Sequence, residues 1–149
     1  MKVNVAFLSS DVGRLFRKRF GVSARQFGVT GTQWRSLAAI QRSPGMNQGA
    51  LAAWLEVEAI TVGRMVDRLE KLGLVERRDD PADRRRWQLF LTGKADDLMA
   101  RMGECAQAVI DESVAGFSDP EKDQLLALLE RVRVNLSDET PAEVNEANG

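Results

Sequence analysis

The chain has 149 residues, of which 44% are hydrophobic, and its 21 Lys and Arg residues nearly balance its 22 Asp and Glu residues. This length allows one ordinary hydrophobic core, and no apolar run reaches the roughly 20 residues that a helix needs to cross a bilayer. With no histidine and one cysteine, the chain excludes Ser-His and Cys-His catalytic pairs, histidine-containing zinc sites and an internal disulfide bond. The first residues lack the apolar length of a secretory signal, so we expect a cytoplasmic protein.

Charge is distributed unevenly along the chain. Residues 1–94 hold 17 Lys and Arg against 9 Asp and Glu, a balance of +8, whereas residues 95–149 hold 4 against 13, a balance of −9. A basic segment is attracted to a polyanion, and an acidic segment is expected to face away from it. The nearly neutral total is therefore no argument against nucleic-acid binding.

The N-terminal segment predicts an amphipathic helix over residues 3–20. Its apolar residues recur at helical spacing, which gives the helix an apolar stripe. We expect Gly21 and the segment to Gly31 to end this helix.

Two shorter helices are predicted next. Thr30-Gly31-Thr32-Gln33 has the form of a capping box, in which the two side chains satisfy free backbone N–H groups, and it opens a helix over residues 32–41. Asn47 can cap a short helix over residues 48–54. The next three residues, 55–57, then turn the chain into another helix.

That next helix carries the most informative pattern in the chain. It ends at Gly73, which can adopt the left-handed conformation that terminates a helix. One face is predicted to be apolar and packed, with Ile60, Met65, Leu69 and Leu72, and another to be polar, with Thr61, Arg64, Arg68 and Lys71. Two short helices joined by a tight turn, the second with a polar outer face, are typical of a helix-turn-helix.

A two-stranded ribbon is predicted after Gly73. Residues 74–77 form the first strand, and Asp80-Pro81 marks a turn. The returning strand alternates Trp87, Leu89 and Leu91 against Gln88, which suits a ribbon with one buried face. Arg84, Arg85 and Arg86 lie at the tip between the strands, where they can reach phosphate or a narrow groove.

The C-terminal part predicts two further helices and a tail. Thr92 can cap a helix that runs to about residue 115, and Ser118-Asp119-Pro120-Glu121 is a capping box that opens a helix over residues 121–136. The last helix has a wider apolar surface than one small domain can cover, which favours a second copy of the chain as its partner. We expect residues 137–149 to be a disordered acidic tail.

Together these segments resemble the MarR (multiple antibiotic resistance regulator) family of transcription factors, with a SlyA-like branch as one option. The residues that carry the resemblance are Gln33-Trp34-Arg35, Asn47-Gln48, residues 66–71, Gly73-Leu74-Val75, Asp80-Pro81-x-Asp83-Arg84-Arg85 and Leu89-x-Leu91-Thr92. The resemblance implies a mainly helical fold in a single domain over residues 1–136. A winged helix-turn-helix would occupy about residues 30–92, and dimerisation helices would occupy residues 1–20 and 93–136.

The resemblance also implies a function. A homodimer would bind a pseudo-palindromic operator in double-stranded DNA, with each recognition helix in the major groove and each wing toward the minor groove, and would act as a repressor or, less often, as an activator. It further implies release by a small aromatic acid or phenolic compound. No cofactor and no membrane partner are expected.

The family pattern assigns roles to individual residues. Arg85 matches the wing arginine that enters the minor groove, and Asp83 matches the acid that holds it. Thr61 and Arg64 match positions that reach base edges and phosphates. The other predicted DNA contacts are Arg68 and Lys71 on the helix, Arg84 and Arg86 on the wing, and Asn47 and Gln48 at the start of the short helix.

Two residues depart from the pattern. Glu58 occupies a helix cap where serine is frequent, and a carboxylate near DNA is unfavourable unless it caps the helix or meets a base amino group such as cytosine N4. Gly63 occupies a position that is often polar in the family.

Each functional interpretation has a structural alternative. The wing arginines could be a solvated loop, and Arg68 could pair with Asp67 or Glu70 at the surface. Aromatic residues favour a core over a ligand site, and these are Trp34, Trp54, Trp87, Phe16, Phe20 and Phe27. Cys105 is expected to be a small buried side chain.

Two other function classes stay open. A winged helix can bind protein in place of DNA, although the segregated basic charge argues against it. An enzyme would need a constellation of reactive groups, and the acid cluster Asp79, Asp80 and Asp83 could bind a divalent cation. The adjacent arginines would neutralise that site, and turn chemistry explains these acids without a metal.

Overall fold

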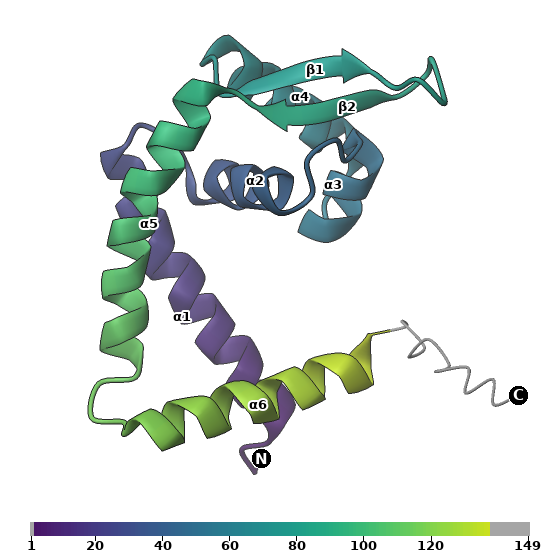
Figure 1. The fold of residues 1–149 in the computed structure, drawn as a ribbon. Coiled ribbons are helices and arrows are strands. Elements are labelled where there is room, and N and C mark those ends of the chain that lie inside the picture. Colours follow the sequence, from purple (N-terminus) through teal and green to yellow (C-terminus); the bar gives the residue numbers. More distant parts are fainter. Residues whose placement is uncertain (1, 138–149) are drawn as a thin grey trace, which may run out of the picture. The chain divides into compact units, whose positions relative to one another are not determined.

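The computed structural model describes residues 2–137 and is mainly helical, with a small two-stranded sheet (Figure 1). The chain divides into two compact units, residues 1–110 and the segment that begins at Asp111. The elements are α1 (Val5–Gln26), α2 (Gly31–Arg42), α3 (Gln48–Leu55), α4 (Ala59–Lys71), β1 (Val75–Asp79), β2 (Trp87–Leu91), α5 (Gly93–Ser113) and α6 (Asp119–Leu136). This order confirms the predicted winged helix-turn-helix fold.

Local hydrogen bonds open α2 and α3 where the sequence predicts them. The Thr30 hydroxyl accepts a bond from the Gln33 N–H at 3.1 Å, and the Gln33 side chain accepts one from the Thr30 N–H at 2.9 Å. Asn47 Oδ1 accepts from the Ala50 N–H at 2.8 Å. Each cap satisfies backbone donors that have no partner inside the helix, so both helix starts are confirmed.

The predicted end of the first helix is wrong, because α1 continues through Gly21 to Gln26. A Cβ atom built on Gly31, the first residue of α2, would lie 3.2 Å from Gly21 Cα. The two glycines therefore let α1 and the start of α2 approach closely. This contact favours glycine inside the helix despite its low helix propensity.

The core of the first unit joins all of its helices and the sheet. Its largest fully buried apolar side chains are Leu37, Ile40, Leu51, Val62, Val66, Leu69, Leu89 and Met102. Ser36 is the single buried polar side chain among residues 2–137, and its hydroxyl donates to the Thr32 carbonyl at 2.8 Å. Its hydrogen bond makes this buried hydroxyl compatible with the apolar surroundings.

The apolar face predicted for α4 is partly wrong. Ile60 is 67% exposed and Leu72 is 41% exposed, whereas Val62 and Val66 are buried beside Met65 and Leu69. Nine residues, or about two and a half turns, separate Ile60 from Leu69, so these two side chains point to opposite sides. Leu72 is the C-terminal cap residue and lies beyond the packed stripe.

The wing is the antiparallel pair of β1 and β2, with Val75 opposite Leu91 and Asp79 opposite Trp87. Gly73, at φ 72°, turns the chain from α4 into β1, as predicted. The loop before α3 adds to the sheet, because the Gly45 N–H donates to the Leu89 carbonyl and the Leu89 N–H to the Met46 carbonyl, both at 2.9 Å. The ribbon ends in a loop that projects beyond the helices (Figure 1).

The aromatic residues are only partly in the core. Trp34 is buried and its ring lies 5.5 Å from that of Phe20, as predicted. Trp54 and Trp87 are each 47% exposed, so the prediction of core positions for these two is wrong. Trp87 pairs with Asp79 at the outer end of the ribbon, beyond the residues that could cover it. Cys105 in α5 is half-buried.

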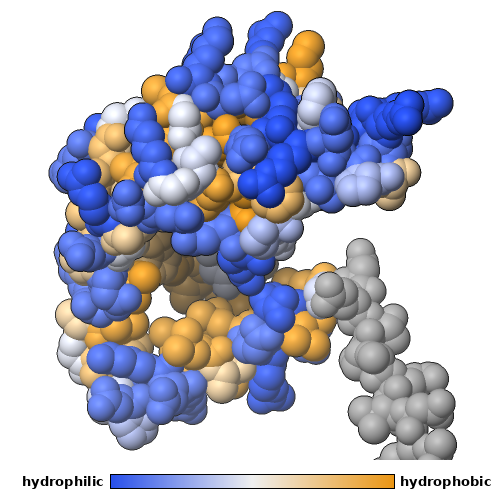
Figure 2. Space-filling model, turned by 45° about the horizontal axis from the view of Figure 1, so that its top comes forward, coloured by the Kyte–Doolittle hydropathy of each residue, from blue (hydrophilic) through white to orange (hydrophobic). Residues whose placement is uncertain are grey.

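In the second unit, the capping box of α6 is confirmed. The Ser118 hydroxyl accepts from the Glu121 N–H at 3.3 Å, and the Glu121 carboxylate accepts from the Ser118 N–H at 3.0 Å. No residue of α6 is buried, and Leu126 and Leu136 are among its exposed apolar side chains. Hydrophobic surface is visible along α6 in Figure 2.

Two further predictions concern the C-terminal tail and membrane-spanning helices. Apart from Ser137, which caps the C-terminus of α6, the predicted acidic tail over residues 137–149 lies outside the described residues. Within residues 2–137, no helix has both the length and the apolar character that a membrane span requires.

Candidate nucleic-acid interface

A tight turn joins α3 to α4. Glu56 adopts a left-handed conformation with φ 56°, and the Val57 N–H donates to the Ala52 carbonyl at 3.1 Å. Glu58 caps α4 by its position, but its carboxylate makes no capping hydrogen bond. The predicted contact residues Thr61, Arg64, Arg68 and Lys71 are all exposed on α4, opposite its buried stripe.

Arg77 on β1 was not among the predicted functional residues, although it links the wing to both helices of the motif. Its guanidinium donates to Gln48 Oε1 at 2.8 Å and to the Gly63 carbonyl at 3.4 Å. It also lies 2.7 Å from Asp67 Oδ1 and 3.6 Å from Glu70 Oε1. The sequence held a signal for this position, since Arg77 shares the inner face of the strand with Val75 two residues before it.

The pairing of Arg77 changes the charge balance of α4. Asp67 and Glu70 are the acids next to Arg68 in sequence, and both pair with Arg77. In residues 2–137 no ion pair joins Arg68 to either acid. The structural alternative, in which Arg68 pairs with Asp67 or Glu70, is therefore wrong. The outer face of α4 therefore keeps its positive charge.

The wing loop is organised by its aspartates. Asp80 Oδ1 accepts from the Ala82 N–H and Asp83 Oδ1 from the Arg85 N–H, both at 2.9 Å. Asp83 Oδ2 lies 3.6 Å from Arg86 Nε. Asp83 thus holds the backbone of Arg85, two residues further along the loop.

The same contacts bear on the metal-site alternative. The aspartates of the loop cap backbone N–H groups, as turn chemistry predicts. Across residues 2–137 no three His, Cys, Asp or Glu side chains are grouped as a metal site requires.

A hollow of about 430 Å³ lies between the wing and the start of α3. It is lined by Asn47, Gln48, Gly49, Arg85, Arg86 and Trp87, so the structure brings four of the predicted contact residues together. Asn47 Oδ1 is engaged in the helix cap and Gln48 Oε1 accepts from Arg77. Their amide N–H groups, the Arg85 guanidinium and the terminal N–H groups of Arg86 remain to donate, which suits acceptor groups such as phosphate oxygens.

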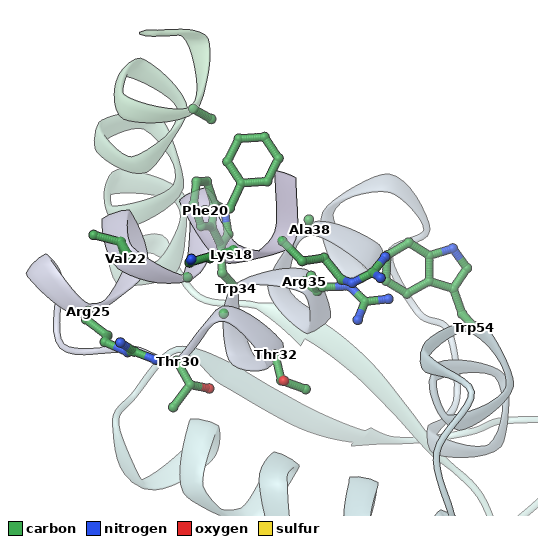
Figure 3. A pocket seen from close by; sticks show the side chains of 14 residues that line it. Lys18, Phe20, Val22, Arg25, Thr30, Thr32, Trp34, Arg35, Ala38 and Trp54 are labelled. Carbon is green, nitrogen blue, oxygen red and sulfur yellow. The ribbon is translucent and has the colours of Figure 1, made fainter. Parts of the chain in front are cut away.

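A second, larger cavity of about 700 Å³ lies among α1, α2, α3 and α5 within the first unit (Figure 3). Its walls combine aromatic rings with four basic side chains, namely Phe20, Trp34 and Trp54 with Arg17, Lys18, Arg25 and Arg35. The Arg35 guanidinium lies 5.6 Å from the centre of the Trp54 ring. This volume and composition are typical of sites for small ligands with an apolar body and a negative charge.

Comparison with known proteins identifies the family. The model of the MarR family matches residues 27–86. A protein of Thauera aromatica, named as a transcriptional regulatory protein for the hcr operon, is 34% identical to this chain over 93% of this chain's length and 88% of that protein's length. The chain belongs to the MarR family. This MarR-family chain is also 30% identical to an HTH-type transcriptional regulator of Bacillus subtilis (strain 168), YybA, over 85% of its own length and 86% of that protein.

Solved MarR structures agree with this fold. A MarR transcriptional regulator of Methanosarcina mazei Go1 superposes with a TM-score of 0.80 at 26% identity, covering 88% of the present chain and 94% of that chain. The apo form of E. coli MarR gives a TM-score of 0.79 at 22% identity and covers 89% and 98%, a likeness that shows the fold alone. This MarR-family chain is thus a winged-helix, DNA-binding transcription regulator, and the two relatives named above are transcriptional regulators.

Proposed function

We propose that this MarR-family chain is a sequence-specific repressor that binds a pseudo-palindromic operator as a homodimer. In this arrangement α4 of each protomer enters the major groove, and the wing loop reaches toward the minor groove. The two recognition helices must then lie about 34–36 Å apart, the spacing of successive major grooves on one side of the duplex.

The uncompensated positive charge of α4 and the wing carries the proposal. Arg64, Arg68 and Lys71 are exposed, while the acids of the same helix pair with Arg77 behind them. Among residues 2–137 neither Arg84 nor Arg85 forms a side-chain ion pair. Such a surface attracts the phosphate backbone and releases its counterions on binding.

Individual contacts follow from position. Thr61 and Arg64 lie in the first half of α4, the part of a recognition helix that reaches base edges, and arginine donates well to guanine O6 and N7. Arg68 and Lys71 lie further along and suit phosphates. Arg85 at the wing tip suits a narrow minor groove, where the potential is most negative.

Exposed apolar surface on the terminal helices supports the homodimer. The first half of α1 exposes Val5, Phe7, Leu8, Val12 and Leu15, and α6 exposes Leu126, Leu128, Leu129, Val134 and Leu136. Surfaces of this kind are unfavourable in a monomer and mark sites of association. A second copy of the chain supplies matching surfaces through two-fold symmetry.

Selection of bound sites from random duplex DNA tests the proposal most directly. We expect a two-fold symmetric site, and a loss of affinity with added salt whose log–log slope is about −0.9 per phosphate contacted. Failure to enrich any sequence, with binding insensitive to salt, would contradict DNA recognition and leave protein binding as the function of the winged helix.

Two substitutions test the contributions of the wing and of the recognition helix to operator binding separately. Arg85→Ala should weaken operator binding strongly without unfolding the chain, whereas Arg78→Ala should have less effect because Arg78 pairs with Glu76 and lies 4.1 Å from the Phe90 ring centre. Arg64→Ala should cost about 1–3 kcal/mol on the operator if it reads a guanine. An equal loss on random DNA would make Arg64 a phosphate contact.

We also propose that a small aromatic acid or phenolic compound binds the cavity of Figure 3 and releases the operator. The aromatic rings suit the ring of the ligand and the basic side chains suit its carboxylate. A panel of aromatic acids should quench tryptophan fluorescence, raise the melting temperature and lower operator affinity, and Arg35→Met should blunt all three effects. A panel without any of these effects would contradict the proposal.

A further inference from the structure

The outer face of α4 carries one large apolar side chain among its polar ones. Ile60 is the second residue of the helix and is 67% exposed, next to Thr61 and one turn before Arg64. The core stripe of α4 is complete without it, because Val62, Val66 and Leu69 are fully buried on the opposite side. Ile60 belongs neither to the core nor to the side chains packed against it.

The neighbouring residue Gly63 adds a second unfavourable feature to the same helix. Glycine lowers helix stability relative to alanine, and Gly63 lies three residues after Ile60, so that the two are neighbours on the helix surface. A Cβ atom at Gly63 would meet nothing closer than Gln48 Nε2, at 3.8 Å, which is an ordinary contact. No contact within the chain therefore requires glycine at this position.

Both features fit a close approach of the helix to a base edge. The N-terminal residues of a recognition helix contact bases in the major groove, where the C5-methyl group of thymine is the apolar group that distinguishes one base from the others. We propose that Ile60 reads a thymine by packing on this methyl group, and that Gly63 keeps the surface beside it open. The inference rests on the proposed DNA-binding function and names a base within its operator.

Removal of the methyl group from DNA tests the contact directly. Once the operator has been selected from random DNA, each thymine is replaced in turn by uracil, which lacks only that group. At one position in each half-site the wild-type chain should lose about fourfold in affinity, the loss expected for one buried methyl-sized group. Ile60→Ala removes the side chain from both protomers, so it should bind the thymine operator about as weakly as the wild type binds the operator with uracil at that position in both half-sites. The variant should not distinguish these two operators.

Two further variants make the test specific. Leu72→Ala removes another exposed apolar side chain of the same helix segment, at its far end, and should respond to uracil as the wild type does. Gly63→Ala should raise the melting temperature while weakening operator binding, a combination that a purely structural role of the glycine does not produce.

The outcomes distinguish the inference from the function on which it rests. If the operator is bound specifically and no uracil substitution separates wild type from Ile60→Ala, the thymine contact is wrong and the repressor proposal stands. If no specific duplex is bound at all, both are wrong. A methyl effect that survives in Ile60→Ala assigns the contact to another side chain and overturns the inference.

Discussion

The winged region and the terminal helices use the same amphipathic pattern with different outcomes. In the winged region the apolar stripes meet within one chain, so Leu37, Leu51 and Leu69 are fully buried. In α6 the stripe has no buried residue, and Leu129 stays exposed. An apolar stripe thus does not guarantee burial within the chain, because the number and length of neighbouring segments decide whether the same chain covers it.

The largest expected effect is in the closed core. Leu37→Ala removes a fully buried side chain of α2 and should lower the free energy of unfolding by about 2–5 kcal/mol, because it loses apolar burial and leaves a cavity. Urea unfolding followed by circular dichroism measures the change. Ile60→Ala is the matched control and should change stability by less than about 0.5 kcal/mol. Similar losses of unfolding free energy in the two variants would contradict the distinction between buried and exposed apolar surface.

A substitution in the exposed apolar stripe of α6 should change the self-association of the chain. Leu129→Glu places a charge in the apolar stripe of α6 and should convert a dimer into monomers, as measured by sedimentation velocity, while the winged region stays folded. Arg131→Gln changes the net charge by the same one unit on the same helix and should leave the dimer intact. Unchanged assembly of Leu129→Glu would remove α6 from the interface.

Substitutions at two helix N-caps in the winged region should change the free energy of unfolding in opposite directions, each by about 1 kcal/mol. Asn47→Ala removes the side chain that caps α3 and should destabilise the chain. Glu58→Ser supplies a capping hydroxyl at α4, where the native carboxylate makes no such bond, and should stabilise it. Equal signs in thermal unfolding would contradict the assignment of the two caps.

The smallest expected effect is a pH dependence of α6. Backbone and side-chain hydrogen bonds from Ser118 lower the pKa of Glu121. The contribution of this carboxylate is therefore fully present above the ordinary glutamate range and is lost as the pH falls through the lowered folded-state pKa. Glu121→Gln keeps an acceptor that does not titrate, so its helical circular dichroism should fall less on acidification. An identical acid profile would contradict the role of this cap.

The sequence was sufficient wherever a hydrogen bond spans three or four residues. The caps at Thr30, Asn47 and Ser118, the end of α4 at Gly73 and the turn before the wing arginines all lie where the pattern predicts them. The same holds for the order of helices and strands. The DNA contact residues themselves stay a prediction, which the proposed experiments address.

The failures of prediction lie where distant segments meet. Gly21 stays inside α1 because Gly31 approaches it, and Trp54 is 47% exposed because neighbouring segments cover only part of it. Ile60 was assigned to the packed face of α4, although its angular position puts it opposite Leu69. That error was one of geometry, since the sequence contained the information.

By itself, the sequence determined three features: the helix boundaries at the caps, the presence of the wing, and the family. These features depend on neighbouring residues and on a distinctive local pattern. Only the tertiary structure decided that Arg77 on β1 pairs with the two acids of α4, Asp67 and Glu70. These pairs leave the outer face of α4 positive. The physical reason is that an ion pair between residues ten positions apart, in a helix and a strand, forms only after those elements have packed. The charge of the surface offered to DNA is therefore a property of the fold and not of the helix sequence.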